Sequence, residues 1–78
     1  MEKVLVIDDS LVQAEYLKLI LQDEYDVTVC QTGADGFLQA MSGEYSLIFL
    51  DVVMPDIDGF MLLRKLQGTV QTKYTPVI

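Results

Sequence analysis

Short apolar runs alternate along this chain with longer stretches in which apolar residues recur at helical spacing. The runs at residues 4–7, 27–30 and 47–50 are too short for typical helices, and a fourth, Val77–Ile78, follows Pro76. Runs of this length with polar flanks predict strands, and a wholly apolar run predicts a strand buried on both faces of a sheet. We therefore expect three strands, the second of them at a sheet edge, and the start of a fourth.

The stretches between the runs predict three amphipathic helices. The first begins after Ser10, which forms a capping box with Gln13, and the second begins after Thr32 by the same logic. The third begins at Asp58 or the next residue. Gly36 should weaken the second helix by ~1 kcal/mol relative to alanine. The residues expected to face the sheet are Leu11, Ala14, Leu17, Ile20 and Leu21 in the first helix, Phe37, Leu38, Ala40 and Met41 in the second, and Phe60, Leu62, Leu63 and Leu66 in the third.

The order of these elements predicts an α/β fold. Strand and helix alternate throughout, and connections of this length indicate right-handed crossovers within a parallel sheet. Two strands end in carboxylates, because Asp8 and Asp9 follow the first run and Asp51 follows the third. Ligands of open parallel sheets bind in the crevice outside the carboxyl ends of the strands, so these acids mark the expected site.

Length and composition limit what the chain can be. Its 78 residues allow one domain, residues 1–78, and 51% hydrophobic with 22% charged residues is typical of a globular protein. No apolar run is long enough to cross a membrane, and the start lacks the features of a secretory signal, so we expect a cytoplasmic location. A net charge of −7 argues against direct nucleic-acid binding. One cysteine and no histidine rule out an internal disulfide and a Cys/His zinc site.

The acids at the strand ends have a structural explanation and a chemical one. Ser10 can cap the first helix by itself, so Asp8 and Asp9 are not both needed for that purpose. Four acids lie at or beside the strand ends, namely Asp8, Asp9, Asp51 and Asp56. Like charges placed together favour a cation between them. Mg²⁺ suits such a site because it takes oxygen ligands and keeps several waters.

Three features together resemble a known family. They are a strand followed by Asp8-Asp9, a strand followed by Asp51, and the motif Met54-Pro55-x-x-Asp58-Gly59. They resemble the receiver domain of two-component response regulators, and the resemblance runs along the whole chain but covers only part of that domain. It implies a flavodoxin-like, doubly wound parallel sheet, here truncated to four strands and three helices in the order 2-1-3-4. The first and third strands are then neighbours, which brings their acids together.

The resemblance also implies a role for each site residue. Asp51 would be the phosphoacceptor, a nucleophile that takes a phosphoryl group from phosphohistidine on a histidine kinase or a histidine phosphotransfer protein. Asp9 and Asp51 would contact Mg²⁺ directly, Asp8 through a bound water, and Val53 through its backbone carbonyl. The chain would be a signalling module with at most self-catalysed phosphoryl transfer, and not an enzyme.

Two other interpretations stay open. A phosphatase of the haloacid dehalogenase type also places a nucleophilic aspartate after a strand, but it has a second aspartate two residues later, where Val53 stands. An interaction module derived from a receiver would keep the acids and act by association. Receivers carry a serine or threonine after the fourth strand and a lysine after the fifth, both beyond Ile78, so we expect phosphorylation to be impaired. An uncovered edge on the fourth strand should also favour a homodimer.

Overall fold

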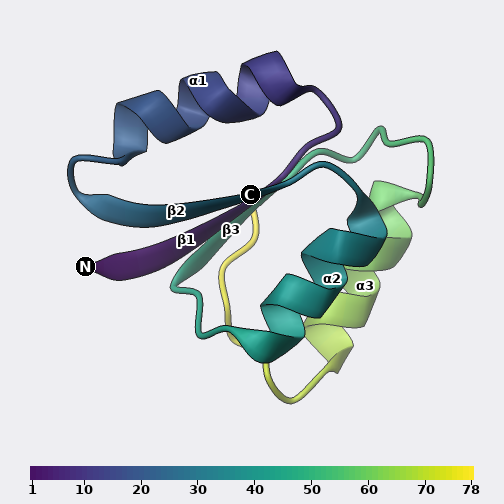
Figure 1. Ribbon diagram of the computed structural model, residues 1–78. Coiled ribbons are helices and arrows are strands. Elements are labelled where there is room, and N and C mark those ends of the chain that lie inside the picture. Colours follow the sequence, from purple (N-terminus) through teal and green to yellow (C-terminus); the bar gives the residue numbers. More distant parts are fainter.

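Three parallel strands form the centre of the computed structural model, which describes all residues from 1 to 78 (Figure 1). The elements are β1 (Glu2–Ile7), α1 (Leu11–Leu21), β2 (Tyr25–Cys30), α2 (Gly33–Ser42), β3 (Leu47–Leu50) and α3 (Gly59–Gly68). The strand order is β2-β1-β3, with Val4 opposite Val27 on one side and Leu47 on the other. The expected α/β class and the edge position of the second strand are confirmed. None of the three helices has the length and apolar character needed to cross a membrane.

The expected fourth strand is reduced to a single bridge. Val77 pairs in parallel with Ile48, on the side of β3 that faces away from β1. The Ile48 N–H donates to the Pro76 carbonyl at 3.0 Å, and the Ile78 N–H donates to the Ile48 carbonyl at 2.9 Å. This position agrees with the order 2-1-3-4. Three residues that begin with a proline, which has no N–H to donate, are too few for a full strand, so the sheet has three strands instead of four.

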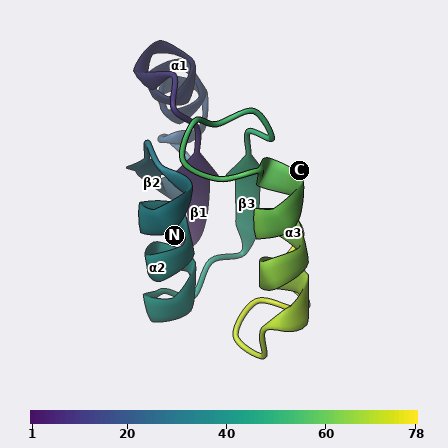
Figure 2. The same ribbon diagram turned by 90° about the vertical axis from the view of Figure 1, so that its right-hand side faces the viewer.

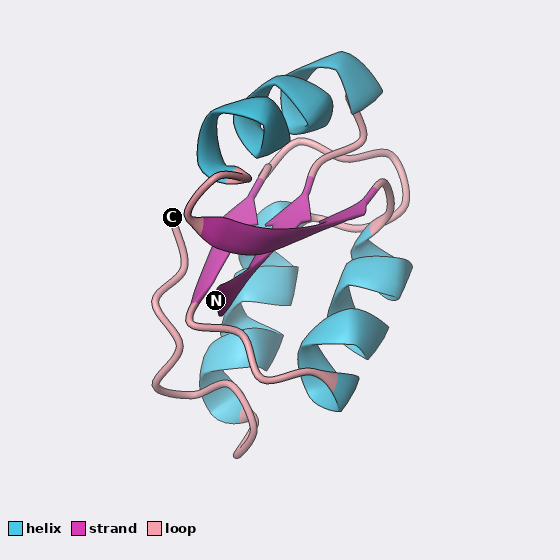
Figure 3. Cartoon of the chain, turned by 60° about the vertical axis from the view of Figure 1, so that its left-hand side comes forward, coloured by secondary structure: helices cyan, strands magenta, loops and turns pink.

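Helices cover both faces of the sheet. α1 lies alone over one face, and α2 and α3 lie side by side over the other (Figures 1 and 2). Figure 3 shows the same two helical layers from another direction. Because successive strand residues point to opposite faces, they enter two separate cores. The core on the α1 side contains Val4, Val6, Ala14 and Val27. The core on the other side contains Leu5, Ile7, Cys30, Ala40, Ile48, Met54, Leu62 and Leu66.

Four apolar residues that were expected to face the sheet are exposed instead. Leu11 and Ile20 of α1 are 49% and 59% exposed, Leu38 of α2 is 65% exposed, and Phe60 of α3 is 60% exposed. α1 is buried mainly at Ala14, which is 1% exposed, and Leu17 and Leu21 pack half-buried against the same core, so only Leu11 and Ile20 of the expected residues lie outside the contact with the sheet. Hydrophobic spacing predicts a helix, but it does not say which of two neighbouring apolar columns faces inward.

Gly36 has a packing role that helix propensity does not reveal. It is buried in α2, and a Cβ at this position would lie 2.6–2.8 Å from three side-chain atoms of Ile7. The glycine therefore lets α2 approach β1 closely. The helix loses some intrinsic stability at this position, and it gains a close contact with the strand that leads into Asp8.

Candidate functional site

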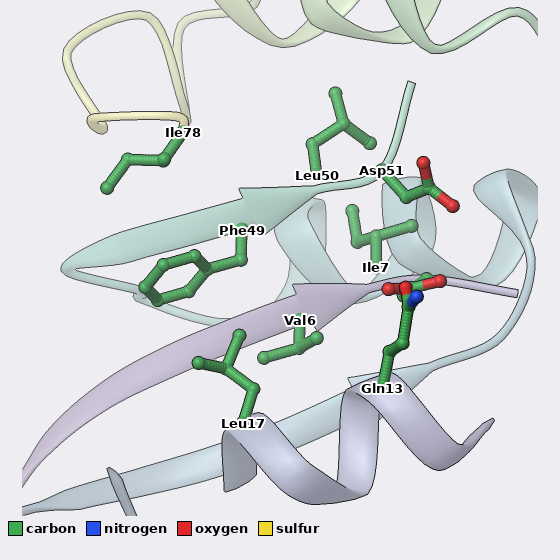
Figure 4. Close-up of a pocket in the computed structure, with 9 residues that line it drawn as sticks. Val6, Ile7, Gln13, Leu17, Phe49, Leu50, Asp51 and Ile78 are labelled. Carbon is green, nitrogen blue, oxygen red and sulfur yellow. The ribbon is translucent and has the colours of Figure 1, made fainter. Parts of the chain in front are cut away.

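The backbone pairing of the sheet continues into the acidic residues at the strand ends. The Asp8 N–H donates to the Cys30 carbonyl at 3.0 Å, and the Asp51 N–H donates to the Ile7 carbonyl at 2.9 Å. These bonds hold the first residue after β1 and the first residue after β3 at the same edge of the sheet. Figure 4 shows Asp51 at this edge, just beyond Leu50.

Carboxylates from the two strand ends converge at this edge. One carboxylate oxygen each from Asp8, Asp9 and Asp51 lie within 4.8 Å of one another. Asp8 and Asp51 are half-buried, and Asp9 is exposed. The adjacency of β1 and β3 thus brings together the three acids that the sequence had singled out.

This crowding alters the protonation of Asp8. Partial burial raises the pKa of its carboxyl above the usual 3.8, and the negative charges of Asp51 and Asp9 raise the pKa further. The Ser10 N–H donates to Asp8 Oδ1 at 2.9 Å and opposes this shift. A cation beside these groups would favour their ionised forms, because an opposite charge nearby stabilises a carboxylate.

Only half of the expected capping box forms at the start of α1. Ser10 Oγ accepts the Gln13 N–H at 3.3 Å, as expected. The Ser10 N–H, however, donates to Asp8, and the Gln13 side chain does not reach back to it. Asp8 therefore helps to shape the entry into α1, and Gln13 lines the pocket beside the acids, which the sequence did not predict.

A pocket of about 230 Å³ adjoins the converging acids. Asp8, Asp51 and Gln13 form its polar end, and Figure 4 shows Asp51 and Gln13 on either side of that end. The remaining wall is apolar and consists of Val6, Ile7, Leu17, Phe49, Leu50 and Ile78. An apolar wall beside carboxylates raises the cost of leaving their charges uncompensated.

The loop after β3 carries the remaining site residue, Val53. The Val53 N–H donates to Asp51 Oδ1 at 3.1 Å, which orients the carboxylate. The Val53 side chain is 77% exposed, and its backbone forms an antiparallel bridge with Asp58. The Gly59 N–H donates to the Val52 carbonyl at 3.1 Å and closes the base of the loop.

Asp56 is engaged elsewhere, which corrects its grouping with the strand-end acids. Its two carboxylate oxygens accept the N–H groups of Gly33 and Ala34 at the start of α2, at 3.0 and 3.1 Å. It is not part of the cluster of three acids. The partners are 22 or 23 residues apart, so no local pattern in the sequence signals this contact.

The donor set at the strand ends fits a small hard cation. It consists of oxygen atoms only, and the exposure of Asp9 leaves room for water. Mg²⁺ prefers such ligands and keeps several waters in its shell. The chain has no histidine, and its one cysteine, Cys30, is buried, so neither an imidazole nor an exposed thiol lies at this edge.

Sequence comparison points to a single family. The family described as the response regulator receiver domain matches residues 4–78. The uncharacterized transcriptional regulatory protein YkoG of Bacillus subtilis is 41% identical over 81 residues, a match that covers 100% of this chain and 35% of YkoG. The chain spans about a third of the length of the curated relatives that it matches.

Solved structures share this fold. The chemotaxis response regulator CheY4 of Vibrio cholerae matches with a TM-score of 0.93 at 32% identity, over 99% of this chain and 65% of CheY4. The response regulator TrrA of Thermotoga maritima, in complex with Mg²⁺-BeF, matches with a TM-score of 0.82 at 32% identity, over 86% and 59% of the two chains. A structure of TrrA in complex with the histidine kinase ThkA matches with a TM-score of 0.89 at 29% identity, over 99% and 66%.

Proposed function

This chain belongs to the response regulator receiver family, and from that premise we propose that Asp51 accepts a phosphoryl group from phosphohistidine, with Mg²⁺ held by the neighbouring acids. The observation that carries the proposal is the convergence of Asp8, Asp9 and Asp51, whose carboxylate oxygens lie within 4.8 Å. Receiver domains are signalling modules of two-component systems and not classical enzymes. Any self-catalysed transfer is limited to the chain's own phosphorylation.

The proposal gives each site residue a place at the metal. Asp9 and Asp51 would hold the ion directly, Asp8 would hold it through a water, and the Val53 carbonyl would complete the protein ligands. When bound, Mg²⁺ would offset the negative charge on the phosphoryl oxygens. The related TrrA was solved in complex with Mg²⁺-BeF, which supports this choice of ion.

Asp51 is the nucleophile in this proposal. Its Oδ1 accepts the Val53 N–H at 3.1 Å, so Oδ2 is the oxygen left to attack phosphorus. An O–P bond forms on Asp51 while the N–P bond of phosphohistidine breaks. The electron pair of that bond returns to the imidazole, which takes up a proton from solvent. The product is an aspartyl phosphate, a known outcome of carboxylate nucleophiles.

Isothermal titration with Mg²⁺ tests the metal site. The wild-type chain should show a saturable heat of Mg²⁺ binding, and Asp51→Asn and Asp9→Asn should bind weakly or not at all. Glu44→Gln removes an exposed acid from the α2–β3 connection and is the control for net charge. Equal binding by all four proteins would refute the site.

Phosphorylation by acetyl phosphate with Mg²⁺, followed by intact mass measurement, tests the role of Asp51. We expect slow, partial addition of one phosphoryl group to the wild type and none to Asp51→Asn. For a chain of these 78 residues we expect a slow reaction, because the resemblance places the assisting hydroxyl after the fourth strand and the assisting lysine after the fifth, outside residues 1–78. A wild type that stays unmodified, or a label on another residue, would contradict the proposal and favour the interaction module.

The phosphoryl donor has a docking surface beside the acids. Val12 and Tyr16 of α1 are 81% and 66% exposed, and they lie four residues apart on one helix face, just after the acidic pair. Exposed apolar side chains of this kind favour a protein partner, and TrrA was solved with its histidine kinase. Val12→Asp should block transfer from a phosphorylated histidine kinase and leave labelling by acetyl phosphate unchanged. Leu38→Asp, at an exposed position of α2, is the control; equal loss in both variants would refute the α1 surface.

Self-association is the second candidate, and the open edge beside β3 favours it. Pro76–Ile78 pair with β3 on one side only, and Ile78 is 71% exposed. An exposed strand edge with apolar residues is a template for another chain. We propose that a chain of these 78 residues forms a two-fold homodimer joined along Pro76–Ile78. Sedimentation equilibrium over a hundredfold dilution should reveal dimers that dissociate; a fully folded monomer throughout would contradict this proposal.

Two further expectations from the sequence belong to this proposal. The net charge of −7 argues against direct binding of nucleic acid, so the output would pass through protein contacts. A cytoplasmic location would give access to the kinase that supplies phosphohistidine. A gel-shift assay with duplex DNA at low salt tests the first of these, and a shift at micromolar protein would contradict it.

A further inference from the structure

The loop between β3 and α3 is fastened to α2 by two separate contacts. Asp56 Oδ1 accepts the Gly33 N–H at 3.0 Å, and Asp56 Oδ2 accepts the Ala34 N–H at 3.1 Å. Next to Asp56, the Ile57 side chain fills the space that a Cβ on Gly33 would need. A glycine at the start of α2 therefore allows the loop to come this close. One contact is polar and the other is steric, and both join the same two segments.

Charge favours the polar contact. The first turn of a helix carries N–H groups without partners inside the helix and a partial positive charge. Thr32 Oγ1 already accepts the Asp35 N–H at 3.1 Å, and Asp56 takes the N–H groups of Gly33 and Ala34. These two N–H groups lower the pKa of Asp56, so its carboxylate is ionised at neutral pH. The contact is a charge-assisted pair of hydrogen bonds between distant parts of the chain.

The same loop is closed at its base. Val53 bridges Asp58, and the Gly59 N–H donates to the Val52 carbonyl at 3.1 Å. The Asp56 contact fastens the loop to α2, and the bridge that contains Val53 closes the loop at its base, so the Asp56 contact and Val53 belong to one connected segment. We propose that Asp56 is a positioning residue, which sets the Val53 carbonyl relative to Asp51 by fastening the loop to α2. This inference rests on the metal site proposed above.

The choice between metal ions can distinguish a residue that positions a metal ligand from a residue that only stabilises the fold. Mg²⁺ demands near-octahedral ligand geometry, whereas Ca²⁺ accepts flexible geometry and variable ligand number. A loosened loop should therefore weaken Mg²⁺ binding more than Ca²⁺ binding. Loss of a negative charge near the site should weaken both ions alike. The ratio of the Mg²⁺ and Ca²⁺ dissociation constants therefore distinguishes a displaced ligand from the loss of a negative charge.

The experiment measures Mg²⁺ and Ca²⁺ binding by isothermal titration in the folded protein. Asp56→Ala removes both hydrogen bonds, and Asp56→Asn keeps one acceptor oxygen and should restore part of the effect. Gly33→Ala forces Ile57 away without any change in charge. Asp35→Ala is the control, because it removes a carboxylate from the same end of α2 and leaves the loop contacts intact.

The expected result is a Mg²⁺ affinity about tenfold weaker in Asp56→Ala, the lower end of the range seen when groups supporting metal ligands are removed. Ca²⁺ affinity should fall by less, Gly33→Ala should act like Asp56→Ala, and Asp35→Ala should keep the wild-type ratio. An unchanged Mg²⁺ to Ca²⁺ ratio in both Asp56→Ala and Gly33→Ala would overturn the positioning role and leave the proposed function intact. A wild type that does not bind Mg²⁺ would overturn the proposed function, and the positioning role would fall with it.

Discussion

Replacing Asp8 by asparagine should make the metal-free protein more stable. The carboxylate oxygens of Asp8, Asp9 and Asp51 lie within 4.8 Å. Asparagine is nearly the same shape and keeps an oxygen that can accept the Ser10 N–H, so the entry into α1 is preserved. The substitution therefore removes one charge and little else. Stability should rise because partial burial and the repulsion from Asp51 and Asp9, which together raise the pKa of Asp8, penalise a charge that asparagine does not carry.

The size of the effect follows from Coulomb's law. Two unit charges at the distance of 4.8 Å repel by about 0.9 kcal/mol at a dielectric constant near 80 and by about 3.5 kcal/mol near 20. Asp9 is exposed and Asp8 is half-buried, so solvent and salt screen much of this repulsion. We expect Asp8→Asn to raise the free energy of unfolding by about 1 kcal/mol at neutral pH and low salt.

Urea unfolding with and without Mg²⁺ tests this reasoning. Mg²⁺ at a hundred times its dissociation constant stabilises the wild type by ~2.7 kcal/mol, and the variant, which has one site charge fewer, should gain less. The stability advantage of the variant should therefore shrink when the ion is added, and it reverses where the gain of the variant falls more than about 1 kcal/mol short of the gain of the wild type. The raised pKa of Asp8 also means that the metal-free wild type loses stability as pH rises through that pKa, so the advantage of the variant should vanish near pH 3. Glu44→Gln is the control and should leave stability unchanged. If it does, and metal-free Asp8→Asn is nevertheless less stable than the wild type, then Asp8 is mainly a structural residue and the reasoning is wrong.

Three further substitutions test other parts of the argument. Gly36→Ala should destabilise the protein by up to about 2 kcal/mol, because overpacking against Ile7 costs about 1–3 kcal/mol and the gain in helix propensity offsets about 1 kcal/mol of it. Gly68→Ala, where a Cβ would meet nothing within 4 Å, should be neutral or stabilising in the same urea titration. Thr72→Val should lower the free energy of unfolding by about 1 kcal/mol, measured by thermal unfolding. Thr72 is only 4% exposed, and its hydroxyl donates to the Leu66 carbonyl, which the methyl group of valine cannot do. Asp56→Asn should destabilise the folded protein at neutral pH, and the difference in stability from wild type should shrink as the pH falls below 3.8. The α2 N–H groups lower the pKa of Asp56 in the folded protein, so protonation removes the stability that the carboxylate contributes. An equal difference in stability at pH 3 and pH 7 would contradict this.

The order of the elements was predictable because it depends on local patterns. The apolar runs predicted the cores of all three strands, and Ser10, Thr32 and Asp58 are the N-caps of the three helices. A capping side chain contacts an N–H only two or three residues away, so a sequence motif contains both partners. The strand order came from the family resemblance, because no local pattern says that β1 lies beside β3.

The inward faces of the helices were predicted less well, and the reason is physical. Leu11 and Ile20 were both expected to face the sheet, but Ala14 is the only fully buried residue of α1, and Leu17 and Leu21 are the apolar residues that pack beside it. Phe60 lies in the first turn of α3, where the chain has just left the loop, and Leu62 and Leu66 take the buried positions. The width of the neighbouring surface decides how much of an apolar stripe is covered, and a single helix carries no information about that width.

The acids at the carboxyl ends of the strands show why acidic residues in a sequence do not by themselves identify a binding site. Asp51 and Asp56 both follow β3 within a few residues, so the local sequence does not distinguish their roles. The fold gives them different neighbours: two N–H groups of α2 compensate the charge of Asp56, and their hydrogen bonds lower its pKa. Asp8 receives one N–H bond, yet burial and two neighbouring carboxylates raise its pKa. In the function proposed above, the acids that would hold a cation are those whose charge the protein leaves uncompensated, and the opposite pKa shifts of Asp8 and Asp56 distinguish such acids from those that hydrogen bonds compensate.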